Sequence, residues 1–136
     1  MAKMTERMKT LLGEVQTAVF STASPDGIPN AVPVGAKKVI DDETVLISDQ
    51  FFNKTLANMQ ANPQAALTYW QGPEGYQLKG RITIETSGPL FEETSKWVGD
   101  ASKKVGIPLI CKGVILLHID AIYGVAPGRR AGRQLA

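Results

Sequence analysis

The segment from Tyr76 to Glu85 alternates between two kinds of side chain over its whole length. Its even positions carry Tyr, Leu, Gly, Ile and Ile, and its odd positions carry Gln, Lys, Arg, Thr and Glu. Successive side chains of a β-strand point to opposite faces, so this pattern predicts a strand with one buried and one solvated face. A chain with such a strand is expected to build a sheet around a core.

Five more segments read as strands, and most of the connections between them are short. Residues 25–27, Pro-Asp-Gly, form a turn signal in which proline presets one φ angle and glycine allows another. Helices are expected near the N-terminus, after a Thr5 cap, and over residues 54–62 and 87–100. We therefore predict a mainly β fold, a six-stranded antiparallel barrel and not a doubly wound sheet. The other five strands are expected at 14–24, 30–40, 45–50, 64–72 and 114–125.

Length and composition narrow the possible functions. The 136 residues show no linker or repeat, so residues 1–136 are expected to form one domain. A net charge of +2 is small for a general nucleic-acid binder. One cysteine, Cys111, excludes an internal disulfide, and one histidine, His118, leaves no multi-histidine metal cluster.

The charged N-terminus is unlike a signal peptide and no apolar run is long enough to span a membrane, so a cytoplasmic protein is expected.

Lys54 stands at an unusual place in the segment DQFFNKTLANMQANP, residues 49–63. Asn53 is a good N-cap and Asn62 ends the helix before Pro63, which makes Lys54 the first helical residue. A helix N-terminus is positive, so a lysine there costs about 0.3–1 kcal/mol. Either an anion is held there by the free N–H groups, the Thr55 hydroxyl and the Lys54 ammonium, or Lys54 is an ordinary solvated lysine.

The strand at 30–40 contains a second unusual feature. Proline in a strand is tolerated where its missing N–H is not needed, so Pro33 predicts an edge or a split. Gly35 and Gly80 either leave room for a flat ligand near the backbone or let a small barrel bend. Because the strand at 45–50 leads directly to Lys54, a ligand with a phosphate there would lie along these two strands. A planar ring suits that position.

Four segments together resemble one known family: PNAVPVGAKKV, TVLISDQFFNKTLANMQANP, YQLKGRITIETSG and IYGVAPGRRAG. They are similar to the pyridoxamine 5'-phosphate oxidase-related, FMN-binding split-barrel proteins, especially the small FMN-binding members, over about residues 10 to 132. The resemblance implies a split barrel, a homodimer and FMN at the subunit interface. It implies that the phosphate is bound by Asn53, Lys54 and Thr55, and that the isoalloxazine is lined by Val32, Pro33, Val34, Gly35, Ile47, Ser48, Asp49 and Gln50.

The resemblance also has departures. Vitamin B6 oxidases of this family are longer and hold the substrate phosphate with additional arginine and histidine residues, a set that cannot be placed here. We therefore expect a small FMN-dependent oxidoreductase or electron carrier with no identified catalytic residue. Relatives in the superfamily bind the deazaflavin F420 or haem. Haem usually needs an axial histidine. His118 is the only candidate, and its mid-strand position favours a hydrogen-bonded structural role.

The alternative is a barrel that binds nucleic acid or another anion through basic side chains, although low net charge and the lack of a paired-aromatic stacking motif count against it. Its candidates are Lys37, Lys38, Lys54, Lys79, Arg81 and the tail arginines Arg129, Arg130 and Arg133. The tail has no periodicity and is expected either to lack fixed structure or to reach a neighbouring subunit's flavin phosphate. Lys112 could lower the pKa of the Cys111 thiol, but without a partner group we expect a packed thiol. Tyr69 and Trp70 could stack on a ring, but aromatic residues in strands usually pack in the core, and we expect that here. The acids at 41–43 are expected to form a solvated turn, not a metal site.

Overall fold

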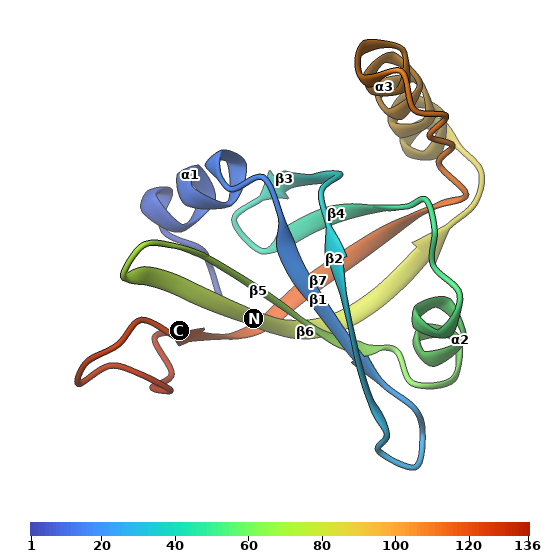
Figure 1. Cartoon of the computed structure of the whole chain (residues 1–136). Helices are drawn as coiled ribbons and strands as arrows, with labels where there is room; N and C mark the ends of the chain where they lie inside the picture. Colours follow the sequence, from blue (N-terminus) through green and yellow to red (C-terminus); the bar gives the residue numbers. More distant parts are fainter.

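A computed structural model describes residues 1–136 as one curled antiparallel sheet with three helices around it (Figure 1). Neighbouring strands pair in the order β2-β1-β5-β6-β7-β4-β3. The elements are α1 (Glu6–Glu14), β1 (Ala18–Ala23), β2 (Pro29–Val34), β3 (Lys37–Asp41), β4 (Thr44–Asp49), α2 (Lys54–Ala61), β5 (Gln64–Gln71), β6 (Glu74–Glu85), α3 (Pro89–Val105) and β7 (Gly113–Gly124). The predicted mainly β barrel is confirmed, and the sheet is a split barrel.

The sheet has seven strands, not six, because the predicted strand at 30–40 is two strands. β2 pairs with β1, with Pro33 opposite Val19, whereas β3 pairs with β4, with Lys37 opposite Ile47. Residues 35–36 thus carry the chain from one edge of the sheet to the other. Proline has no N–H to donate to a further strand, so its place in an edge strand costs no ladder hydrogen bond. The prediction of an edge or a split at Pro33 is therefore confirmed.

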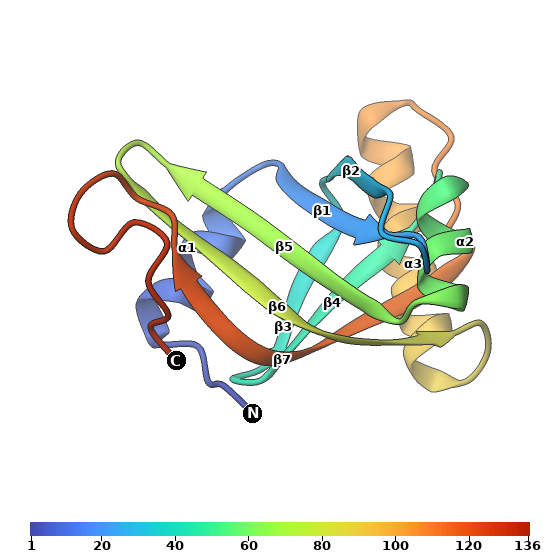
Figure 2. The same cartoon turned by 90° about the horizontal axis from the view of Figure 1, so that it is seen from below.

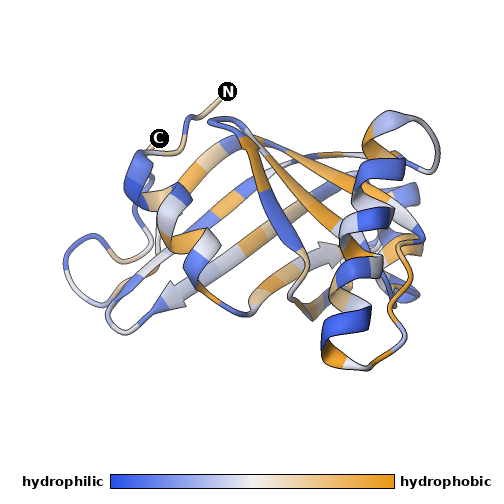
Figure 3. Cartoon of the chain, turned by 90° about the horizontal axis from the view of Figure 1, so that it is seen from above, coloured by the Kyte–Doolittle hydropathy of each residue, from blue (hydrophilic) through white to orange (hydrophobic).

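The core fills the inside of the curled sheet, and α1 covers one opening (Figure 2). Apolar and polar residues alternate along the strands (Figure 3). Met8, Leu11 and Leu12 of α1 are buried in this core. The predicted cap is present, because the Thr5 hydroxyl accepts the Met8 N–H at 3.2 Å. None of the three helices is both long enough and apolar enough to span a membrane.

The third helix is longer than predicted, since it continues beyond residue 100 to Val105. It ends at Gly106, whose φ of 70° is a left-handed conformation that glycine adopts without strain. The helix packs outside the barrel, where Val98 joins Leu46, Cys111 and Val114 in a second apolar cluster. The long helix therefore covers part of β4 and the start of β7.

Gly80 lies at a bulge where β6 meets β7. A Cβ atom at this position would overlap the carbonyl oxygen of His118 and lie 2.7 Å from its carbonyl carbon. The close approach of the two backbones explains the glycine, so of its two interpretations the structure supports barrel bending. The His118 ring lies 2.9 Å from the Thr83 hydroxyl, which confirms a hydrogen-bonded structural histidine.

Candidate functional site: a pocket between the split and helix α2

A pocket of about 390 Å³ lies where the link between β2 and β3 faces the end of β4 and the start of α2. This volume is within the range of sites that bind small molecules. Its walls are Asn30, Val32, Pro33, Val34, Gly35, Ala36, Ser48, Gln50, Phe51, Phe52, Asn53, Lys54 and Thr55. The structure thus brings together all but two of the predicted site residues.

The two exceptions are Ile47 and Asp49, which do not line the pocket. Ile47 is fully buried in the core. Asp49 is also buried, and its carboxylate accepts the Phe52 N–H at 3.0 Å and lies 3.7 Å from the Lys112 ammonium. Alternation along β4 explains the difference, since neighbours of Ser48 face the other way. Asp49 fixes the loop that precedes α2.

The start of α2 presents free N–H groups to the pocket. Asn53 occupies the N-cap position as predicted, but its side chain makes no capping hydrogen bond. The first turn contains no acidic residue, and Lys54 forms no ion pair within the chain. The first N–H groups of a helix have no partner inside the helix. Positive charge is therefore concentrated here without a balancing group from the chain.

Ser48 contributes a buried hydroxyl without a hydrogen-bond partner. The residue is 4% exposed, and its backbone N–H donates to the Ala36 carbonyl at 3.0 Å. An unsatisfied buried hydroxyl costs about 1–3 kcal/mol, so such groups are rare without a functional reason. Ser48 is also one of the residues that line the pocket.

Gly35 differs from Gly80 in its surroundings. A Cβ atom at position 35 would meet only the Gln16 carbonyl oxygen, at an ordinary contact distance of 3.6 Å. Packing within the chain therefore does not require glycine at this position. Its place in the pocket wall supports the other interpretation, in which the missing side chain leaves room for a ligand.

Four pocket residues were not predicted: Asn30, Ala36, Phe51 and Phe52. Asn30 shares a strand face with Val32 and Val34, so the two-residue period could have identified it. The two phenylalanines lie in a loop, where periodicity carries no signal. Phe52 anchors that loop by stacking on Phe20 with ring centroids 5.8 Å apart, whereas Phe51 is 73% exposed.

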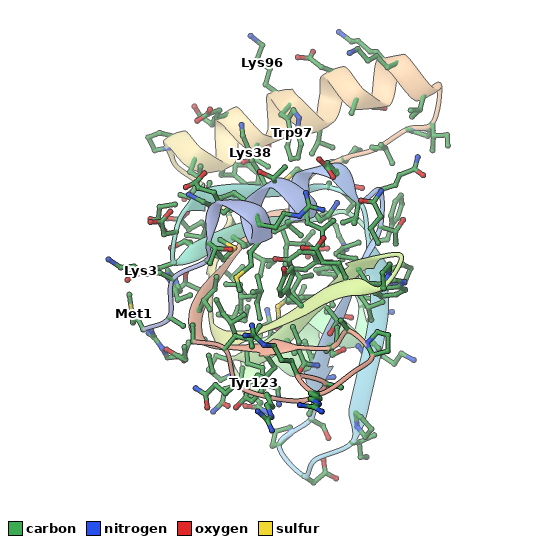
Figure 4. The ribbon with its side chains drawn as sticks, turned by 90° about the vertical axis from the view of Figure 1, so that its left-hand side faces the viewer. Met1, Lys3, Lys38, Lys96, Trp97 and Tyr123 are labelled. Carbon is green, nitrogen blue, oxygen red and sulfur yellow. The ribbon has the colours of Figure 1, made fainter.

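A second, mostly apolar hollow of about 300 Å³ adjoins the first and shares three of its residues, Gly35, Ala36 and Gln50. The rest of its wall is Trp97, Val98, Ala101 and Leu109. The Lys38 ammonium lies 5.6 Å from the centre of the Trp97 ring (Figure 4).

The remaining candidates have structural explanations. Cys111 is a packed thiol as predicted, and its S–H donates to the Gly113 carbonyl at 3.3 Å. Tyr69 is buried as predicted, which raises the pKa of its phenol. The prediction for Trp70 was wrong. Trp70 is the next residue after Tyr69 in β5, so its side chain lies on the opposite, outer face of the strand, where it is 53% exposed. Asp42 of the acidic turn pairs with Lys9 at 2.6 Å.

Several basic residues of the alternative function are engaged within the chain. Lys37 donates to the Val15 carbonyl at 2.6 Å, and burial lowers the pKa of this lysine. Lys79 lies over the Tyr123 ring and Arg81 pairs with Asp120. The tail has a defined path, since it returns to β7 through bridge and backbone hydrogen bonds at residues 134–136. Whether the tail arginines reach another subunit stays a prediction.

Comparison with known proteins identifies the family. The sequence model of the pyridoxamine 5'-phosphate oxidase family matches residues 4–126. The chain belongs to this family. An uncharacterized protein of Methanocaldococcus jannaschii is 38% identical over 138 residues, which cover 98% of this chain and 89% of that protein.

Solved structures share the fold of this pyridoxamine 5'-phosphate oxidase family member. HupZ of Group A Streptococcus has a TM-score of 0.79 and 25% identity, covering 95% of this chain and 99% of HupZ. An FMN-binding protein of Syntrophomonas wolfei has a TM-score of 0.75 and 18% identity, covering 89% of this chain and 85% of that protein. An F420 reductase has a TM-score of 0.63 and 17% identity, covering 84% of this chain and 94% of the reductase. The haem storage protein HutZ of Vibrio cholerae has a TM-score of 0.65 and 12% identity, covering 90% of this chain and 94% of HutZ. Proteins named for FMN, F420 and haem therefore share this fold.

Proposed function

We propose that this chain is an FMN-binding flavoprotein that works as a homodimer, either as a small oxidoreductase or as an electron carrier. One observation carries the proposal. A single pocket contains a lysine without an acidic partner at an uncapped helix start and a buried hydroxyl without a hydrogen-bond partner. A ligand with an anionic group and a polar ring satisfies both, and FMN has both.

Each part of the pocket has a role in this proposal. The N–H groups at the start of α2, the Lys54 ammonium and the Thr55 hydroxyl bind the phosphate. The ring lies against residues 32–35, where Ser48 and Gln50 can hydrogen-bond its polar edge. When bound, FMN supplies the redox chemistry. The adjoining hollow beside Trp97 gives a redox partner access to the ring.

Haem fits these residues less well than a flavin. Its iron usually takes an axial protein ligand, and His118 is outside the pocket wall and hydrogen-bonded to Thr83. The porphyrin face also offers no partner to the Ser48 hydroxyl. A deazaflavin shares the polar ring and the phosphate of FMN, so F420 is the second candidate, and absorbance distinguishes the two.

Sedimentation of the purified protein, followed at a flavin absorption wavelength, tests cofactor and assembly together. We expect flavin absorbance to sediment at twice the chain mass of 14.7 kDa and FMN to be released on denaturation. Flavin sedimenting with a single chain would overturn the dimer. A haem or deazaflavin spectrum, or no saturable binding of added FMN, would overturn the cofactor assignment.

Replacement of Ser48 by alanine tests the ring contact. A neutral hydrogen bond contributes about 0.5–1.5 kcal/mol, so Ser48→Ala should weaken FMN and riboflavin equally, by about two- to tenfold. The protein without ligand should be as stable as before or slightly more stable, because an unsatisfied hydroxyl is removed. Titration calorimetry and thermal unfolding measure the two effects.

Ser95 provides the matched control for this experiment. Its hydroxyl is also buried without a partner, but it belongs to α3 and lies outside the pocket wall. Ser95→Ala should therefore change stability alone and leave both flavins bound as tightly as in the wild type. An unchanged affinity in Ser48→Ala would show that the ring does not use this hydroxyl.

A further inference from the structure

We propose that Asn30 is a positioning residue that orients the Thr55 hydroxyl toward the ligand's phosphate. The inference rests on the proposed FMN site and deepens it. Asn30 lies on β2, whereas Thr55 lies on α2. Neither the fold nor the family resemblance assigns Asn30 a role, and the structure brings it to the pocket wall.

A small polar network joins three elements at this place. The Asn30 amide nitrogen donates to the Thr55 hydroxyl at 2.9 Å and to the Thr22 hydroxyl at 3.3 Å. Thr22 lies opposite Asn30 in the pairing of β1 with β2. The Asn58 amide nitrogen, from α2, donates to the same Thr22 hydroxyl at 3.1 Å. Both threonines are buried, at 1% exposure for Thr55 and 5% for Thr22.

The direction of the hydrogen bond to Thr55 carries the argument. An amide nitrogen donates and cannot accept, so it occupies a lone pair of the Thr55 oxygen. The hydroxyl proton then points elsewhere, and the only side-chain hydrogen bond of Thr55 within the chain is the one that its oxygen accepts from Asn30. Thr55 lines the pocket, so the proton is available to an anionic oxygen there. Asn30 thereby holds Thr55 as a donor before the phosphate arrives, which reduces the ordering needed on binding.

A comparison with Asn58 distinguishes the orientation of the Thr55 hydroxyl from a purely structural role of Asn30. It contacts Thr22, as Asn30 does, but it has no hydrogen bond to Thr55. Loss of Asn58 should loosen the attachment of α2 to β1 without freeing the Thr55 hydroxyl. Asn58→Ala is therefore the matched control for Asn30→Ala.

Two further substitutions keep the inference testable if Asn30→Ala is poorly folded. Asn30→Asp has nearly the same shape, but a carboxylate accepts hydrogen bonds and would take the Thr55 proton while adding negative charge beside the phosphate. Thr55→Val removes the hydroxyl itself. If Asn30 acts through Thr55, the loss in Asn30→Ala and the loss in Thr55→Val should not add.

The experiment is calorimetric titration of FMN and of riboflavin, which lacks the phosphate, into the full chain and these variants. We expect Asn30→Ala to weaken FMN by about three- to tenfold and Asn30→Asp by more than about tenfold, with riboflavin affinity unchanged. Asn58→Ala should leave the ratio of the two affinities at its wild-type value. In the Asn30→Ala, Thr55→Val double variant, FMN should bind about as it does to Thr55→Val alone.

One result would overturn the inference while the proposed function stands: an Asn30→Ala variant that prefers FMN over riboflavin as strongly as the wild type does, whether both affinities are unchanged or both fall by the same factor. Additive losses in the double variant would also overturn it. A wild type that binds neither flavin would instead overturn the proposed function itself.

Discussion

Lys54→Ala is expected to weaken FMN binding by about ten- to a hundredfold while riboflavin binding stays nearly unchanged. A hydrogen bond to a charged group contributes roughly 1.5–3 kcal/mol, and Lys54 is the cation at the uncapped start of α2. Thr55→Val should have a smaller effect, because it removes a neutral hydroxyl. Without ligand, the Lys54→Ala variant should be as stable as the wild type or slightly more stable, since the positive helix end no longer repels a lysine.

Titration of both flavins into wild type and variant measures this effect. Lys96→Ala makes the same change of charge on α3, where the side chain points away from the molecule (Figure 4), and should leave both affinities unchanged. Equal losses of FMN and riboflavin in Lys54→Ala would show that the lysine acts on the fold or on the ring, and the phosphate explanation would have to be abandoned.

Gly80→Ala should strongly destabilise the protein, by about 3 kcal/mol or more, which corresponds to a fall in Tm of roughly 10 °C. The added methyl group would overlap the His118 carbonyl on the neighbouring strand. Both groups belong to the backbone of paired strands, so relief requires a shift of the ladder between β6 and β7. Thermal unfolding followed by circular dichroism measures the change.

Gly99→Ala is the control, because a methyl group at this position of α3 would meet nothing within 4 Å. Alanine within a helix is more favourable than glycine, so this variant should gain about 0.5–1 kcal/mol. A Gly80→Ala variant as stable as the wild type would mean that the bulge can open at little cost and that the close backbone approach does not shape the barrel.

Local patterns predicted most of the elements, because each depends on residues close together in the chain. The alternation at 76–85 identified β6, and the Asn53 and Pro63 signals placed α2 within a residue of its observed ends. Pro33 indicated an edge or a split, but the strand at 30–40 was still counted once. Periodicity continues across residues 35–36, and only the pairing of each half with a different strand divides it.

The pocket residues also divide into those that the sequence predicted and those whose place only the tertiary structure decided. Val32 to Gly35, Ser48, Gln50 and the segment 53–55 were named from the sequence, largely through the family resemblance, and the structure brings them to one pocket. Ile47 and Asp49 were named with them because the family resemblance implies a role for the whole strand before Lys54, without distinguishing the two faces of that strand. Phe51 and Phe52 were missed because they lie in a loop, where no periodic pattern indicates which side chains point toward the pocket.

By itself, the sequence determined most of the strands, the helix that starts at Lys54 and the lysine's unfavourable place there, since these follow from neighbours in the chain. Tertiary structure alone decided that β2 and the link after it share a pocket with the start of α2, that the Ser48 hydroxyl is buried without a partner, and that Asn30 reaches Thr55 across 25 positions. The physical reason is that a periodic pattern states which face of an element is buried, whereas hydrogen bonds between distant side chains depend on how the curled sheet closes.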